Sequence, residues 1–103
     1  MRLLERNDYK KVENLLKEKQ NIEEEQYKIA IEEITKFFDV YMYKEFLNLF
    51  YFERYKYKNR YSDNRSMMRY LCKKLFTSEP QLYMVRKEIV YKSAMIFYKY
   101  NLL

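Results

Sequence analysis

The chain has 103 residues, of which 49% are apolar, and its formal net charge is +6. This length predicts one domain, residues 1–103, with enough apolar side chains for a hydrophobic core. Because the sequence has no glycine, the tight turns of β-hairpins are disfavoured. We therefore predict an all-α fold, a compact bundle of four or five helices. A single cysteine and no histidine exclude an internal disulfide and a Cys/His zinc site, so we expect no metal and no cofactor.

The N-terminal residues lack the apolar run of a signal peptide, and no stretch reaches the roughly 18 apolar residues of a membrane span. We therefore expect a cytoplasmic protein with no membrane partner. The sequence has no histidine and no glycine-rich phosphate loop, and no serine sits in a nucleophile elbow. Without such a catalytic constellation, we do not expect an enzyme.

Charge divides the chain into two parts. Residues 1–39 contain 8 Lys and Arg against 10 Asp and Glu, a net charge of −2, whereas residues 40–103 contain 13 against 5, a net charge of +8. A basic surface of this kind attracts polyanions. The chain thus has an acidic N-terminal helical region, residues 1–39, and a basic region, residues 40–103, whose charge makes a polyanion the first partner to consider.

Residues 8–38 repeat an apolar face at helical spacing, formed by Tyr9, Val12, Leu16, Tyr27, Ile31, Ile34 and Phe38. Leu16, Tyr27 and Phe38 are eleven residues apart, nearly three helical turns, so the two halves of the face are in phase. One helix and two helices both satisfy this pattern. The polar residues Gln20 and Glu23 interrupt the face, which favours a break near Gln20–Ile22.

The next predicted helix covers about Val40–Tyr55, and aromatic and cationic residues alternate over residues 50–61. Interleaved rings and cations can bind nucleic acid, since cations meet phosphates and rings stack on bases. The alternative is the edge of a core helix whose lysines extend their charged ends into water. In the first interpretation the DNA contacts from this segment are Lys56, Lys58 and Arg60.

A helix-turn-helix pattern follows near residues 63–90. Ser62 or Asp63 can cap a short helix that ends at Leu75, and Thr77 or Ser78 can cap the last helix. The connection of three or four residues is the length that such a motif needs. Three cations lie on the outer face of the first helix, and we expect them to contact phosphates: Arg65, Arg69 and Lys73.

The last helix is predicted over about Glu79–Tyr100, with an apolar arc over half of its circumference. This arc contains Leu82, Tyr83, Val85, Ile89, Val90, Ser93, Ala94, Ile96 and Phe97. Arg86 falls toward the arc, so we expect it to pair with a carboxylate. The opposite face carries Pro80, Met84, Lys87 and Tyr91, a thin set for reading bases.

The segment Leu75–Ile89 resembles the turn and recognition helix of sigma-factor region 4-like regulators, and among these the ArpU/RinA-type phage late-gene activators. The resemblance extends over about residues 42–103. Two positions depart from the pattern: Phe76 stands where such turns usually have Gly, and Thr77 where they usually have Val or Ile. The resemblance implies groove-facing positions at Ser78, Gln81 and Lys87, and backbone contacts from Arg69 and Lys73.

We expect a DNA-binding transcriptional regulator of phage or mobile-element origin that binds duplex DNA. The expected contacts are Lys56, Lys58, Arg60, Arg65, Arg69, Lys73, Ser78, Gln81 and Lys87. The alternative is a small helical protein–protein interaction module, or an inhibitor of a host protein, with no nucleic acid. RNA polymerase or another protein partner, and a homodimer, are compatible with these hypotheses.

Overall fold

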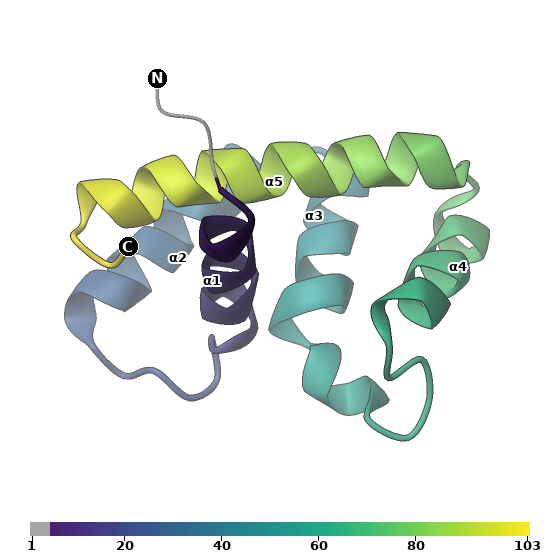
Figure 1. Cartoon of the computed structure of the whole chain (residues 1–103), viewed down its shortest axis with the longest axis horizontal. Coiled ribbons are helices and arrows are strands. Elements are labelled where there is room, and N and C mark those ends of the chain that lie inside the picture. Colours follow the sequence, from purple (N-terminus) through teal and green to yellow (C-terminus); the bar gives the residue numbers. More distant parts are fainter. Residues whose placement is uncertain (1–4) are drawn as a thin grey trace.

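The longest helix of the protein lies near its C-terminus and supports the other helices (Figure 1). The structure is a computed structural model and describes residues 5–103. The first four residues, and with them part of the segment on which the signal-peptide expectation rests, lie outside it. The elements in chain order are α1 (Arg6–Lys17), α2 (Glu25–Phe37), α3 (Tyr41–Phe46), the π-helical segment η1 (Leu47–Phe52), the 3₁₀ turn η2 (Arg54–Tyr57), α4 (Asn64–Leu75) and α5 (Glu79–Lys99). No strand occurs in the described residues, which confirms the predicted all-α fold.

Helix α5 has 21 residues and is therefore about 31 Å long. The hydroxyl of Ser78 caps its first turn by accepting from the backbone N–H of Gln81 at 3.3 Å, as predicted. Its buried residues are Leu82, Val85, Ile89, Val90, Ser93, Ala94, Ile96 and Phe97, which confirms most of the predicted arc. Tyr83 is the exception, because it is 45% exposed and lies beside the exposed Met84 on an open edge of the helix.

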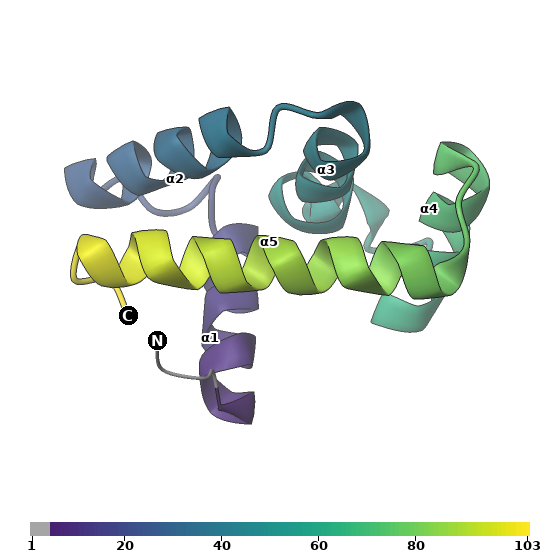
Figure 2. The ribbon, with the colours of Figure 1, turned by 90° about the horizontal axis from the view of Figure 1, so that it is seen from above.

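Helices α1 and α2 are separate, and the chain turns between them at residues 18–21. This confirms the favoured break near Gln20–Ile22 and excludes one continuous helix over 8–38. The reversal is held by Tyr27, whose hydroxyl donates to the backbone carbonyl of Leu15. Helix α2 then runs beside the C-terminal half of α5 (Figure 2), where the rings of Tyr27 and Phe97 stack with centroids 6.1 Å apart.

The predicted helix over Val40–Tyr55 changes character along its length. It is α-helical as α3 but becomes π-helical in η1, and it ends in η2. Four consecutive side chains, Leu49–Phe52, are buried. Four consecutive side chains span most of the circumference of a helix, so the burial of all four means that the segment is covered on nearly every side. This segment is therefore a central part of the hydrophobic core.

Helix α4 begins at the predicted cap and packs against the first half of α5. Asp63 Oδ1 accepts from the backbone N–H of Ser66 at 2.8 Å, and the side chains of Met67, Met68, Leu71 and Leu75 are buried. Cys72 is half-buried in this helix, and burial raises the pKa of its thiol. None of the helices in residues 5–103 has the length and apolar character needed to cross a membrane.

Candidate nucleic-acid interface and an adjacent cationic cleft

The turn between α4 and α5 consists of residues 76–78, within the predicted length. Phe76 has φ 53° and ψ 51°, the left-handed conformation that glycine adopts most easily. The backbone N–H of Thr77 donates to the carbonyl of Cys72 at 3.1 Å and closes the end of α4. Phe76 therefore takes the backbone conformation of a glycine, while its ring is 95% exposed.

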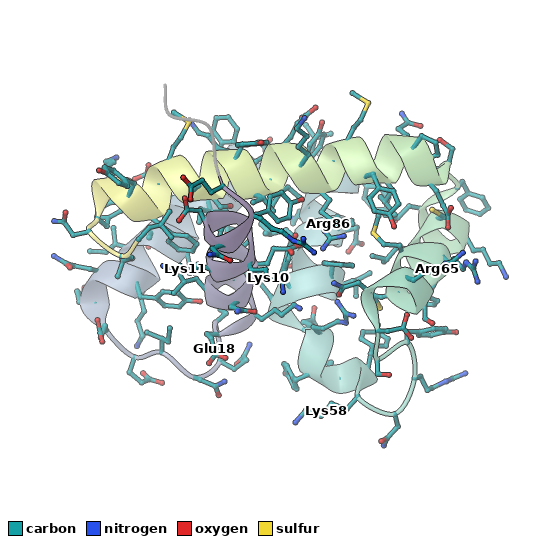
Figure 3. The ribbon with its side chains drawn as sticks, in the orientation of Figure 1. Lys10, Lys11, Glu18, Lys58, Arg65 and Arg86 are labelled. Carbon is teal, nitrogen blue, oxygen red and sulfur yellow. The ribbon has the colours of Figure 1, made fainter. Side chains whose placement is uncertain are left out.

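The outer side of α4 carries the three predicted cations, and all three are exposed. Figure 3 shows Arg65 pointing away from the body of the protein. Arg69 Nε lies 3.8 Å from Glu79 Oε1, an exposed contact between α4 and the first turn of α5. No hydrogen bond or ion pair involves the side chain of Arg65 or Lys73 within the part of the chain that the structure describes. Their charges are therefore available to a partner.

The predicted groove-facing residues lie at the start of α5, where local contacts partly occupy them. The Ser78 hydroxyl acts as the helix cap. Gln81 Oε1 accepts from Thr77 Oγ1 at 2.9 Å, which leaves the amide nitrogen of this exposed side chain for a partner. Lys87 is exposed, and its Nζ lies 5.7 Å from the centroid of the Tyr91 ring.

The remaining predicted contacts, Lys56, Lys58 and Arg60, lie in and after η2, before α4 begins. Lys56 pairs with Glu53, and Figure 3 shows Lys58 at the lower end of the molecule. Since α4 is about 18 Å long, this group is separated from the turn at residues 76–78. Three of the nine predicted residues therefore lie before α4, three along its outer side, and three from the turn at residues 76–78 into α5.

The rings of the alternating segment pack mostly against one another. Tyr61 stacks on Tyr70 of α4 with centroids 4.4 Å apart, and Tyr57 lies 5.8 Å from the same ring. Tyr57 and Tyr61 are half-buried, whereas Tyr55 is 49% exposed. The core-edge interpretation therefore holds for two of these three rings, and Tyr55 alone stays open for stacking.

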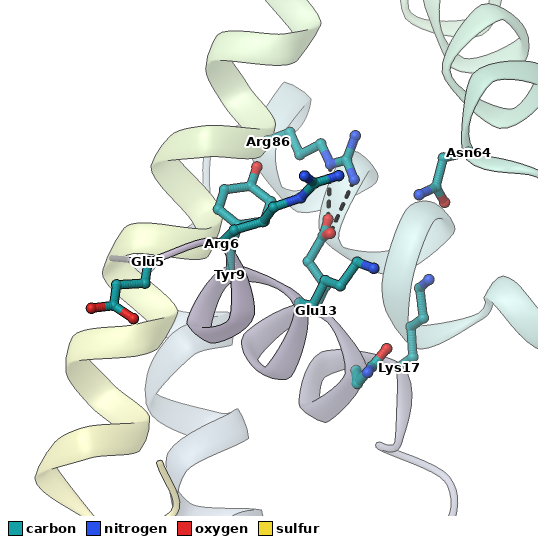
Figure 4. Close-up of a pocket in the computed structure, with 9 residues that line it drawn as sticks. Glu5, Arg6, Tyr9, Glu13, Lys17, Asn64 and Arg86 are labelled. Atoms are coloured by element: carbon teal, nitrogen blue, oxygen red, sulfur yellow. Dashed lines mark hydrogen bonds and ion pairs between the residues drawn. The ribbon is translucent and has the colours of Figure 1, made fainter. Parts of the chain in front are cut away.

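A cleft that sequence reasoning did not predict opens between α1, the start of α4 and α5 (Figure 4). Its volume is about 590 Å³. We call it the cationic cleft, and it is lined by Glu5, Arg6, Tyr9, Lys10, Glu13, Asn14, Lys17, Asn64 and Arg86. Three of its cations recur along α1 at spacings of four and seven residues, which places them on one side of a helix. That signal was hidden by the net negative charge of residues 1–39.

Arg86 and Glu13 form a buried ion pair at the back of this cleft. Arg86 Nε and Nη2 donate to the two carboxylate oxygens of Glu13 at 2.8 and 3.0 Å, and the hydroxyl of Tyr51 donates to Glu13 Oε2 at 2.6 Å. Burial opposes the charge of Arg86, but the hydrogen bonds and charge of Glu13 outweigh it and raise the pKa of the guanidinium. The predicted carboxylate partner of Arg86 is thus confirmed.

A second half-buried arginine, Arg54, lies next to this pair without a carboxylate partner. It donates to the backbone carbonyls of Phe50 and Ser62 and to Asn64 Oδ1, at 3.2–3.3 Å. Burial and then the charge of Arg54 lower the pKa of Lys17. Cations from three elements, α1, η2 and α5, therefore converge on one region.

No family model, curated protein or solved structure matches this chain. Among the described residues, no group of three His, Cys, Asp or Glu side chains could hold a metal ion.

Proposed function

We propose that the protein binds duplex DNA through α4 and the start of α5 and regulates transcription. The observation that carries this proposal is the exposed cationic side of α4, joined by a three-residue turn to a capped helix. The sequence resemblance to ArpU/RinA-type activators is the basis for proposing a role in transcription regulation and an origin in a phage or mobile element.

In this proposal the cations of α4 contact phosphates. Arg65, Arg69 and Lys73 follow one another at intervals of four residues, so they lie along one side of the helix. Cations so placed fix the position of a protein on the duplex without reading its sequence. Gln81 and Lys87 at the start of α5 supply the donors that would meet base edges. Because this set is small, phosphate contacts dominate the expected affinity.

Fluorescence anisotropy with a labelled duplex tests the proposal. If the three α4 cations each neutralise one phosphate, the affinity should fall about 40-fold between roughly 50 and 200 mM salt. Lys73→Ala should weaken binding to all sequences and reduce the salt slope by about one unit. Lys36→Ala, an exposed lysine of α2, is the matched control and should leave the slope unchanged. Absence of binding at about 50 mM salt by the folded protein would refute DNA binding.

A protein partner is the second candidate, favoured by the exposed face of α5. Met84, Met95 and Tyr98 are 63%, 50% and 65% exposed and lie within a narrow arc of the helix. Apolar side chains gathered on one helix face are typical of an interaction surface. If a second copy covers this face, the protein should sediment as a dimer and Met95→Lys as a monomer. A monomeric wild-type protein would exclude the homodimer.

A further inference from the structure

The cationic cleft contains more positive charge than its own carboxylates neutralise. Of the two carboxylates, Glu13 is occupied by Arg86 and Tyr51, and Glu5 points away from the cations in Figure 4. Within residues 5–103, no ion pair involves Arg6, Lys10 or Lys17. The cleft therefore keeps three uncompensated cations in addition to the neighbouring Arg54.

The side chains converge instead of spreading into solvent. Arg6, Lys17, Asn64 and Arg86 reach toward the same space from three helices in Figure 4. Lys17 is half-buried, although burial and the charge of Arg54 both disfavour its protonated form. Like charges brought together in a partly desolvated recess are unfavourable unless an anion joins them.

Hydrogen-bond donors accompany these charges. Asn64 Oδ1 accepts from Arg54 at 3.2 Å, so the amide N–H groups of Asn64 remain free to donate. Arg86 uses Nε and Nη2 for Glu13, and its Nη1 is left without a carboxylate. Guanidinium, ammonium and amide donors around one space match the several oxygens of a phosphate group.

The volume and depth of the cleft suit a small ligand. The side chain of Arg86 is only 14% exposed and Lys17 is half-buried, so both lie deeper in the cleft than the exposed Arg6 and Lys10. A volume of about 590 Å³ falls within the range of small-molecule sites, about 300–1,000 Å³. The ring of Tyr9 adds an apolar wall.

We propose that the cationic cleft binds the phosphate group of a small phosphorylated molecule. Arg6, Lys10 and Lys17 supply its charge partners, and Arg86 Nη1 and the amide of Asn64 supply further hydrogen-bond donors. The proposal does not depend on DNA binding, because none of these residues belongs to the outer side of α4 or to the exposed side of α5.

An NMR titration at constant ionic strength tests this site, with inorganic phosphate and adenosine monophosphate as probes and adenosine as the uncharged control. Both phosphate probes should give saturable shifts at the amides of Lys17, Asn64 and Arg86, and adenosine none. Lys17→Gln and Lys10→Gln should each weaken adenosine monophosphate binding at least about tenfold. Lys11→Gln is the matched control, since Figure 3 shows Lys10 and Lys11 on opposite sides of α1, and it should change the affinity less than about twofold.

Three results would overturn the proposal. These are shifts that do not saturate, an equal effect of sodium chloride, and an equal loss of affinity in Lys11→Gln. The proposal would also be overturned if a short DNA duplex gave saturable shifts and adenosine monophosphate did not. That result would make the cleft part of a nucleic-acid interface. Lys73→Ala separates the two proposals, because it should weaken duplex binding and leave adenosine monophosphate binding unchanged.

Discussion

Replacing Glu13 by glutamine tests the ion pair that joins the first helix to the last. Glu13 is 7% exposed and holds two donors of Arg86 and the hydroxyl of Tyr51. Glutamine keeps the volume, but its amide N–H groups meet the N–H groups of the guanidinium, and the charge of Arg86 loses its partner. Removing one member of a buried pair costs about 3–5 kcal/mol. We expect about 3 kcal/mol, since Arg86 also borders the open cleft.

Urea unfolding followed by far-UV circular dichroism measures this loss. With a slope of about 1–1.5 kcal/mol per M urea, the midpoint should fall by roughly 2–3 M. Glu32→Gln is the control, because its pair with Lys36 is exposed on α2 and contributes less than about 0.5 kcal/mol. The double variant Glu13→Gln/Arg86→Met should be more stable than Glu13→Gln alone, since no unpaired charge stays buried. A loss below about 1 kcal/mol in Glu13→Gln, or additive single effects, would refute this reasoning.

Three further predictions concern the turn, the core and the response to alkali. Phe76→Gly should raise the free energy of unfolding by about 0.5–1 kcal/mol. Glycine removes the cost of the left-handed conformation, about 1–2 kcal/mol, and this gain exceeds the entropy that glycine adds to the unfolded chain. A lower urea midpoint for Phe76→Gly would contradict this prediction. Leu82→Ala should leave a cavity and lower the free energy of unfolding by about 2–5 kcal/mol, whereas Lys87→Ala should lower it by less than about 0.5 kcal/mol. Equal melting temperatures of the two variants would show that the buried face of α5 is assigned to the wrong residues. Burial raises the pKa of Tyr27 above its ordinary value of 10.0, so the unfolded chain loses this proton first and stability should fall as the pH rises above 10. Tyr27→Phe should reduce that fall in pH-dependent urea unfolding, and an unchanged pH dependence would exclude Tyr27 as its source.

Local sequence signals were sufficient for most of the helices. The cap at Asp63, the cap at Ser78 and the apolar face of α5 all depend on residues a few positions apart, so they can be read along the chain. The break near Gln20–Ile22 followed in the same way from polar residues on an apolar face. The DNA contacts expected from the sequence stay predictions, because the exposure of a side chain does not identify its partner.

Tertiary packing decided the features that involve distant residues. The burial of Leu49–Phe52 on nearly every side of the π-helical segment depends on the helices that surround it, and Tyr83 is exposed because that edge of α5 stays open. The cationic cleft joins Lys17, Asn64 and Arg86 from separate elements, and its charge was concealed by the acidic total of the first 39 residues. Glu13 and Arg86 are 73 positions apart. Periodicity specifies which face of a helix is apolar, but it carries no information about which other helix will cover that face.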